Sequence, residues 1–351
     1  MNYTIFGESH GSAIGVAITG LPAGLELDLQ AIEFEMARRA TGKNKLSTPR
    51  KEADQIEWLS GVFEGKTTGT PLALMIRNTD QHSKDYTQLK ILPRPSHADY
   101  SGAVRYNGCG DYRGGGHFSG RLTAPLVAAG AIAKQILAQR GVFVGAHIAS
   151  IAGIPDTPLD SAADARALLS SVARKDFPVI DDQAGQQMQQ AILQAREEQD
   201  SVGGTIECMV SGLPVGLGSP DLDENAEGIF ARHLFAVPAV KGLEFGAGFA
   251  FANMRGSQAN DPFYMDGSAV RTRTNHSGGI NGGITNGMPL VFTVVMRPTP
   301  SIAREQDTIN LTTGENAKLS IQGRHDPCIV HRAVPVIEAA AALAACQLLG
   351  I

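Results

Sequence analysis

The sequence contains an internal repeat, and this repeat constrains the fold more than any other feature does. Three pairs of segments match each other in the same order along the chain, and both members of the first pair end in a Gly-Leu-Pro-x-Gly-Leu turn. The pairs are IGVAITGLPAGL (14–25) with IECMVSGLPVGL (206–217), TGTPLALMIRNT (68–79) with NGMPLVFTVVMRPT (286–299), and RLTAPLVAAGAIAKQIL (121–137) with RAVPVIEAAAALAACQLL (332–349). Three collinear matches indicate a duplicated unit, with repeats at about residues 1–141 and 200–351.

Each repeat has the same predicted order of elements. A strand comes before the Gly-Leu-Pro turn, and an amphipathic helix follows it at residues 29–39 in the first repeat and 224–235 in the second. A strand-rich middle leads to a closing Ala-rich helix that is apolar nearly all round, so this helix must be buried on every side. We therefore predict a single domain, residues 1–351, with two central helices between two sheets and pseudo-twofold symmetry. The polar stretch of about 155–200 is predicted to be an insertion with a helix around residues 184–197.

Composition and charge exclude several classes of protein. The chain has 351 residues, of which 43% are hydrophobic and 19% are charged, and this balance excludes intrinsic disorder. A net charge of −5 gives no field that attracts nucleic acid or an anionic membrane. No apolar run has the length of a membrane span, and the first ten residues do not resemble a signal peptide. The cysteines have no CxxC spacing, which argues against a zinc site and a disulfide framework. We expect a reduced cytoplasmic enzyme without a metal.

Three short motifs come close to known functional fingerprints, and each fails. Residues 7–11, GESHG, match the turn that carries the serine of α/β-hydrolases, but only one short strand precedes them. Residues 61–67, GVFEGKT, are one residue short of a P-loop and precede a predicted strand. Residues 108–116 would need glycine in place of Arg113 to form a dinucleotide-binding fingerprint. We therefore exclude hydrolase, P-loop and Rossmann-type sites.

A run of cations stands out on this acidic chain. The segment from Met36 to Lys51 holds six cations and no acid between them, and the cations are Arg38, Arg39, Lys43, Lys45, Arg50 and Lys51. A solvated loop is one interpretation. Because six charges without partners repel one another unless an anion is bound, we favour a site for a polyanionic small molecule, to which arginine offers bidentate hydrogen bonds.

Two histidines lie in glycine- and serine-rich contexts that suit catalysis. His10 is in GESHG, His97 is in RPSHADYSG, and Asp326 belongs to RHDP just before the second closing helix. The segments around His97 and Asp326 occupy equivalent places in the repeats, so an active site on the pseudo-dyad would draw on both. Histidine suits proton transfer near neutral pH. Glycine-dense loops at 111–116 and 275–283 let the backbone approach a flat or phosphorylated ligand. Structural histidines and tight turns are the alternatives, but the combination favours a large, planar, anionic cofactor.

Several segments spread over nearly the whole chain carry a resemblance to one family. They are FGESHG (6–11), RKEADQIEWLSGVFEGKTTGTPLAL (50–74), NTDQHSKDY (78–86), SHADY (96–100), DYRGGG (111–116), VKGLEFGAGF (240–249), NHSGGINGG (275–283) and GRHDPC (323–328). In this order they resemble the chorismate synthase family. The resemblance implies an α+β fold, a β-α-β sandwich with central buried helices between antiparallel sheets. It also implies a homotetrameric lyase of the shikimate pathway that depends on reduced FMN. Its reaction would be the 1,4-anti elimination of phosphate from 5-enolpyruvylshikimate 3-phosphate, which gives chorismate.

The resemblance also implies roles for individual residues. His10 would protonate the leaving phosphate, His97 would sit beside N1 of the reduced flavin, and Asp326 would help to take the ring proton. The residues implied at the substrate or NADP site are Arg39 and Lys45, with Arg50, Arg105, Arg113 and Arg121 as further anion-binding candidates. The implied FMN contacts are Ser119, Ala239, Gly282, Arg297, Pro298, Thr299, Pro300, Ser301 and Arg324.

Two places depart from the common pattern of the family. The chain has His117 and Phe118 where many members have Arg-Ser, and Pro238 where many have asparagine. Side-chain contacts at these positions are therefore open. It is also open whether NADPH or an external flavin reductase reduces the flavin. A flavin- or phosphoanion-binding homologue without activity is the alternative function, although the presence of both histidines and Asp326 favours the enzyme.

Overall fold

The first of two sheets is built from the N-terminal part of the chain. The computed structural model describes residues 1–42, 46, 54–79, 88–321 and 326–351. The first sheet has the spatial order β1 (Asn2–Gly7), β2 (Ala13–Thr19), β6 (Leu72–Arg77), β3 (Ile56–Ser60), and every neighbouring pair is antiparallel. Alternate side chains of β2 and β6 are fully buried, as the period of two in a strand requires for a sheet with one apolar face.

The second sheet comes from the C-terminal part of the chain and is also antiparallel. Its spatial order is β10 (Val240–Phe245), β15 (Leu290–Met296), β9 (Gly204–Ser211), β7 (Phe143–Ile151), β8 (Ile154–Pro155). Consecutive residues of β9 and β15 are buried, so this sheet is covered on both faces.

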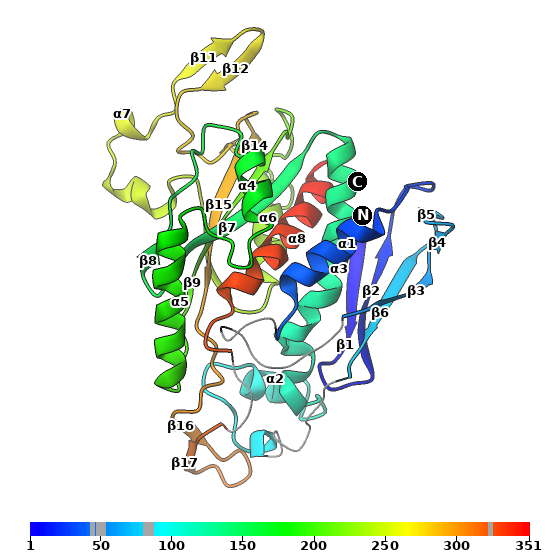
Figure 1. The fold of residues 1–351 in the computed structure, drawn as a ribbon, viewed down its shortest axis with the longest axis vertical. Coiled ribbons are helices and arrows are strands. Elements are labelled where there is room, and N and C mark those ends of the chain that lie inside the picture. Colours follow the sequence, from blue (N-terminus) through cyan, green and yellow to red (C-terminus); the bar gives the residue numbers. More distant parts are fainter. Residues whose placement is uncertain (43–45, 47–53, 80–87, 322–325) are drawn as a thin grey trace.

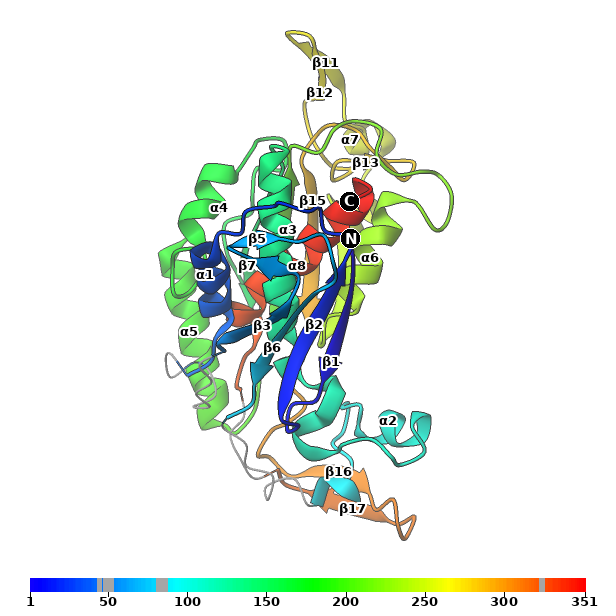
Figure 2. The ribbon, with the colours of Figure 1, turned by 90° about the vertical axis from the view of Figure 1, so that its right-hand side faces the viewer.

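Two long helices lie between the sheets (Figures 1 and 2). α3 (Thr123–Gln139) packs on the first sheet, α8 (Val330–Leu348) packs on the second, and the helices pack against each other. At their contact, a Cβ on Gly130 would lie 2.2 Å from the Cβ of Ala339, so glycine is what permits the close approach. α1 (Leu29–Arg39) and α6 (Ala226–Phe235) flank this pair. The predicted buried helices and α+β sandwich are confirmed.

The predicted insertion packs against the second sheet. It carries α4 (Arg166–Val172), which the sequence did not predict, and α5 (Asp182–Glu197), which begins two residues before the predicted helix. α5 joins the main core, and the α4 side covers the outer face of the sheet. Leu159 and Leu169 pack with Met209 of β9 and Val291 of β15 in a small apolar cluster. The insertion therefore explains why this sheet, unlike the first, is apolar on both faces.

The two sheets share one topology. The order β1-β2-β6-β3 of the first sheet corresponds to β7-β9-β15-β10 in the second. β7 precedes the Gly-Leu-Pro strand β9 as β1 precedes β2, and we therefore propose that the second repeat begins with β7 and not near residue 200.

Shorter elements project from the two ends of the sandwich. At one end of the long axis lie the hairpins β11 (Phe263–Asp266)–β12 (Ala269–Thr272) and β13 (Ile280–Asn281)–β14 (Ile284–Thr285), together with α7 (Gly256–Ala259) (Figures 1 and 2). At the other end lie α2 (Asp99–Arg105) and the hairpin β16 (Gln306–Ile309)–β17 (Asn316–Leu319). Short 3-10 turns occur at η2 (Arg113–Phe118), η3 (Gly120–Leu122) and η4 (Gly248–Asn253).

The structure also settles three points of the sequence analysis. Residues 7–11 connect the antiparallel strands β1 and β2, and residues 61–67 form the hairpin β4 (Val62–Phe63)–β5 (Lys66–Thr67), so neither is a hydrolase turn or a P-loop.

The expected equivalence of the segments around His97 and Asp326 is wrong. α2, η2 and η3 separate His97 from α3, whereas Asp326 lies directly before α8. The segment Gly120–Gln139 is long and apolar enough to cross a membrane, but most of it is buried as a core helix.

Candidate active site

The glycines of η2 bring His10 and His97 to one place. Gly114 and Gly115 both have left-handed backbones, with φ of +61° and +99°. A Cβ on Gly114 would lie 2.1 Å from Cε1 and Nδ1 of His10, and a Cβ on Gly115 would lie 3.2 Å from Cε1 and Nε2 of His97. Because consecutive Cα atoms are about 3.8 Å apart, two imidazoles that are distant in sequence share one short strip of backbone.

His10 is held from behind by the hydroxyl of Ser9. Its imidazole is buried in the β1–β2 connection, and Ser9 Oγ lies 3.1 Å from its Nδ1. The Ser9 hydroxyl donates its one hydrogen to the carbonyl oxygen of Arg113 at 3.3 Å, so it accepts the hydrogen of His10 Nδ1. Nδ1 of His10 therefore carries a hydrogen, and Nε2 carries the lone pair when the ring is neutral.

His97 lies in the turn before α2, where its imidazole contacts the carboxylate of Asp99 and the guanidinium of Arg94. Its Nδ1 is 2.6 Å from Oδ1 of Asp99, and Nε of Arg94 donates to Oδ2 of Asp99 at 2.7 Å. Burial lowers the pKa of His97, and the hydrogen bond to Asp99 opposes that shift. Burial raises the pKa of Asp99, but Arg94 and His97 outweigh it and hold that pKa well below its usual range. Asp99 is therefore an anion beside the imidazole.

A cavity of about 540 Å³ opens beside His97 and is lined by both halves of the chain. Its lining residues include His97, His117, Phe118, Pro238, Ala239 and Arg297. Ala239 has a left-handed backbone with φ of +76°, a strained conformation for a residue other than glycine. Burial lowers the pKa of the Arg297 guanidinium, and its Nε is buried without a hydrogen-bond partner. The cavity thus offers apolar walls and one incompletely satisfied cation.

The loop after β15 connects this cavity to Asp326. The backbone N–H of Arg297 donates to the carbonyl oxygen of Ala239 at 3.0 Å, and Ser301 Oγ accepts from Arg94 Nη1 at 3.1 Å. Thr299 Oγ1 donates to the carbonyl oxygen of Asp326 at 2.8 Å. The carboxylate of Asp326 forms an ion pair with Arg332 of α8. Asp326 therefore lies next to the predicted FMN loop and contacts a cation of α8.

The expectation that the cations of 38–51 have no partners is wrong for the two of them that the structure describes. Arg39 donates through Nη1 to Asp54 Oδ2 at 2.7 Å and through Nε to Thr123 Oγ1 at 3.0 Å. Arg121 pairs with the other carboxylate oxygen of Asp54, and Arg38 pairs with Glu338 of α8. These acids lie outside the cationic segment of the sequence and reach it only through the fold. Among the described residues, Asp54 thus joins Arg39 of α1 to Arg121 of η3.

The remaining predicted residues are placed as follows. Asn78 accepts from Arg121 Nε at 3.1 Å and donates to the carbonyl oxygens of Glu8 and Gly11, which connects the Arg39–Asp54–Arg121 cluster to the His10 loop. Arg113 forms a fork with Asp111. Ser119 caps η3 by accepting from the N–H of Arg121.

Some predicted residues do not join this cluster in the described structure. Arg105 is exposed at the end of α2, outside the lining of the cavity beside His97. Gly282 lies in the β13–β14 hairpin, at the opposite end of the molecule from α2 (Figure 1). Lys45, Arg50 and Arg324 lie outside the described residues.

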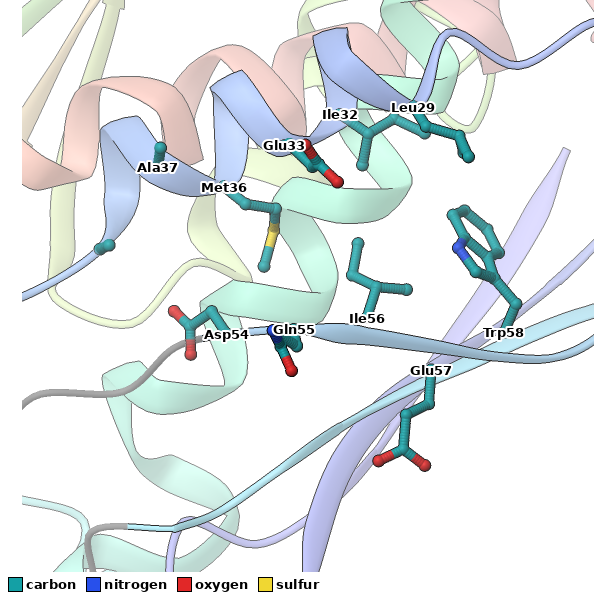
Figure 3. Close-up of a pocket in the computed structure, with 11 residues that line it drawn as sticks. Leu29, Ile32, Glu33, Met36, Ala37, Asp54, Gln55, Ile56, Glu57 and Trp58 are labelled. Atoms are coloured by element: carbon teal, nitrogen blue, oxygen red, sulfur yellow. The ribbon is translucent and has the colours of Figure 1, made fainter. Parts of the chain in front are cut away.

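A second cavity, of about 630 Å³, lies between α1 and β3 (Figure 3). Met36 and Ile32 line it from the helix, and Asp54 and Trp58 stand at its two ends. Asp54 therefore faces this cavity as well as Arg39 and Arg121. The sequence did not predict this second cavity.

Comparison with known proteins identifies the family. The family model for chorismate synthase matches residues 1–349. The chorismate synthase of Dehalococcoides mccartyi is 47% identical over 336 residues, which is 96% of this chain and 91% of that protein. The chain belongs to the chorismate synthase family. The chorismate synthase of Methanosarcina mazei is 46% identical over 97% of this chain and 92% of that protein, and that of Synechocystis is 45% identical over 98% and 94%. A crystal structure of a chorismate synthase superposes with a TM-score of 0.78 and 29% identity, over 99% of this chain and 91% of that one.

Membership of the chorismate synthase family makes this chain a lyase of the shikimate pathway, which supplies aromatic biosynthesis.

The residues that sequence reasoning missed are those that hold the predicted site in place: Ser9, Asp54, Asn78, Arg94 and Asp99. Ser9 and Asp99 stand inside the motifs GESHG and SHADY, so a polar neighbour of each histidine was visible in the sequence. The role of Asp54 was not, because it depends on the approach of α1 to η3.

Proposed function

We propose that this chain catalyses the 1,4-anti elimination of phosphate from 5-enolpyruvylshikimate 3-phosphate, with reduced FMN as its cofactor. The family assignment supports the reaction. The observation that supports it for this chain is that His10 and His97 meet on consecutive glycines, and that His97 lines a cavity to which both halves of the chain contribute.

The residues around the cavity fit a flavin mononucleotide. A volume of about 540 Å³ is in the usual range for a small-molecule site. Phe118 and Pro238 offer apolar walls to a flat ring, and the buried Nε of Arg297 lacks the acceptor that an anionic ligand would supply. The proposed FMN residues are Ser119, Ala239, Arg297, Pro298, Thr299, Pro300, Ser301 and Arg324. When bound, reduced FMN supplies electron density that assists the departure of phosphate.

The substrate loses a C–O bond to phosphate and a C–H bond, and one new double bond balances the two. His10 protonates the leaving phosphate through Nε2, because Ser9 occupies its Nδ1. Asp326, which is paired with Arg332, takes up the proton that leaves the ring. Arg39 and Arg121, which meet at Asp54, hold the carboxylates and the phosphate together with Lys45 and Arg50.

Anaerobic phosphate release from the substrate tests this proposal. We expect equal amounts of phosphate and chorismate with photoreduced FMN, and none with oxidised FMN or without flavin. Replacing His10 or His97 by alanine lowers the rate on the order of 10²- to 10⁴-fold, as for other general acid–base groups. Flavin binding without turnover in any of these conditions would instead establish the non-catalytic alternative.

We also infer a cytoplasmic homotetramer whose flavin is reduced by NADPH or by an external reductase, on the strength of the family assignment. Gly282 lies far from the cavity in one chain, so a contact between Gly282 and FMN requires a second copy. Light scattering measures the mass of the assembly, and anaerobic bleaching of FMN by NADPH, with and without a flavin reductase, separates the two reductants.

A further inference from the structure

We propose that Asp99 and Arg94 are positioning residues that hold His97 in the tautomer with its hydrogen on Nδ1 and present Nε2 to the active-site cavity. The inference rests on the proposed function, in which His97 faces the bound flavin. Neither residue belongs to the predicted site, and neither lines the cavity beside His97.

The contacts of Nδ1 decide the tautomer. Oδ1 of Asp99 lies 2.6 Å from Nδ1 of His97, and a carboxylate can only accept a hydrogen bond. Nη2 of Arg94 also lies 3.1 Å from Nδ1, but it can only donate, and it is closer to Oδ1 of Asp99, at 2.8 Å. A hydrogen on Nδ1 satisfies the carboxylate, whereas a lone pair there would face it at 2.6 Å. The hydrogen therefore belongs on Nδ1.

Arg94 holds the carboxylate of Asp99 in place, and this carboxylate in turn orients His97. Oδ2 of Asp99 accepts from the backbone N–H of Arg94 at 2.9 Å and from its Nε at 2.7 Å, while Oδ1 accepts from Nη2. The Arg94 side chain is buried, and its Nη1 donates to Ser301. The His97 N–H also donates to the carbonyl oxygen of Arg94 at 3.1 Å. These bonds close one short turn, in which Asp99 cannot rotate without losing several donors.

The opposite edge of the imidazole faces the site. Cε1 and Nε2 of His97 lie against Gly115, at the place where a Cβ would be 3.2 Å away. Ser96, directly before His97, has a left-handed backbone with φ of +59°, and Arg297 of the cavity donates to its carbonyl oxygen. With the hydrogen on Nδ1, Nε2 carries a lone pair when the ring is neutral and donates when it is charged. The Asp99 carboxylate stabilises the charged form, as the buried acid of a catalytic triad does.

Replacing Asp99 with asparagine tests the arrangement with little change in shape. Two Arg94 donors meet at Oδ2 and only one at Oδ1, so the amide oxygen takes the place of Oδ2 and the amide nitrogen faces Nδ1 of His97. An amide nitrogen donates, so Nδ1 must accept and the hydrogen moves to Nε2. The matched control is Glu57→Gln, which removes a solvent-exposed fork with Arg77 on the first sheet.

The direct readout is the tautomer of His97 in the flavin-free protein. Solid-state NMR of ¹⁵N-histidine-labelled protein distinguishes the two tautomers, and the His97→Gln variant identifies the signals of His97 among the nine histidines. We expect a hydrogen on Nδ1 in the wild type and in Glu57→Gln, and on Nε2 in Asp99→Asn. A wild-type His97 with its hydrogen on Nε2, or in a mixture of tautomers, would overturn the proposal even if the Asp99 variant fails to fold.

Kinetics then separate positioning from structural support. Asp99→Asn should lower kcat at least 100-fold and leave the KM of the substrate within about threefold. Arg94→Lys keeps the charge but loses the fork, and should lower kcat by a smaller factor. Glu57→Gln should retain the wild-type rate. An Asp99→Asn protein with the changed tautomer and full activity would contradict the positioning role. A wild type without any activity would instead refute the proposed function, while the NMR result would still stand.

Discussion

At the scale of single residues, the proposed active site depends on the absence of side chains at two glycines as well as on the two histidines. His10 and His97 come together because Gly114 and Gly115 have no Cβ, and both glycines adopt left-handed backbones that other residues rarely enter. Gly108, a short distance earlier, is also left-handed, but a Cβ there would meet nothing within 4 Å. Gly114 is therefore needed both for its left-handed backbone and for the close approach of His10, whereas Gly108 is needed only for its left-handed backbone.

Gly114→Ala should disable the enzyme, because its Cβ would lie 2.1 Å from the His10 ring and displace it. We expect kcat to fall on the order of 100-fold or more, as for loss of a general acid. Gly108→Ala introduces similar backbone strain, roughly 1–2 kcal/mol, without touching a histidine, and should keep its rate. Steady-state phosphate release measures both, and equal losses would mean that backbone strain, not contact with His10, is responsible.

His117 should contribute little to flavin binding, although it replaces a common arginine. Its Nδ1 lies 2.9 Å from the carbonyl oxygen of Gly7, so it donates to the β1–β2 connection. We expect His117→Ala to change the Kd of FMN by less than tenfold, about 1.4 kcal/mol, and Arg297→Ala to weaken binding more. Quenching of FMN fluorescence with substrate present measures both. The reverse order would show that the glycine-rich turn, and not the loop after β15, anchors the flavin.

At the scale of elements, one buried histidine fastens the insertion to the second sheet. Nδ1 of His147 in β7 lies 3.0 Å from Asp156, and its Nε2 lies 2.9 Å from Glu207 of β9. Asp156 also accepts from the N–H groups of Ile180 and Asp181, just before α5. Burial lowers the pKa of His147, but hydrogen bonds to the two carboxylates outweigh it and raise the pKa above its usual value. The charged imidazole therefore binds both layers.

This contact predicts a pH-dependent stability with a definite sign. Because the folded pKa of His147 is raised, its contribution is complete below the unfolded value near 6.5 and is lost as pH rises through the folded value. The difference in unfolding free energy between wild type and His147→Gln should thus be larger at pH 6 than at pH 9, measured by urea denaturation. His233, whose pKa is lowered by burial, gives the control, since its contribution is lost as pH falls. A difference for His147→Gln that does not change with pH would contradict the charged state.

At the scale of the whole molecule, one buried acid connects both halves of the chain. Glu338 of α8 accepts from Arg38 of α1 at 2.8 Å and from the N–H of Ala146 in β7 at 3.0 Å, and it pairs with Lys134 of α3. Burial raises the pKa of Glu338, but Arg38 and Lys134 outweigh it and lower it. Four elements from the two repeats therefore share one carboxylate at the centre of the sandwich.

Glu338→Gln should destabilise the fold strongly, because it leaves Arg38 and Lys134 buried with only Glu35 as a shared acid. Breaking a buried ion pair by removing one partner costs about 3–5 kcal/mol. Guanidinium denaturation measures the loss, and Glu57→Gln, which breaks an exposed pair with Arg77, should leave the midpoint nearly unchanged. Similar midpoints for the two variants would mean that the central network contributes no more than a surface pair.

The sequence by itself determined most of the elements, and it predicted their repetition and the residues of the proposed site. Apolar periodicity predicted α1, the buried helices α3 and α8, and the strands that enclose them, because these patterns are local and depend on burial alone. Motifs placed His10, His97 and the loop after β15, and the structure brings these together.

Only the tertiary structure decided which charges meet. Arg38 and Arg39 appeared to lack partners because Asp54 and Glu338 lie outside the cationic segment, the latter 300 residues away. The sequence also does not show the tautomer of His97, the distance of Gly282 from the cavity or the correspondence of β7 with β1. An ion pair or a hydrogen bond depends on a separation of a few ångströms, and for residues distant in sequence that separation exists only once the chain has folded.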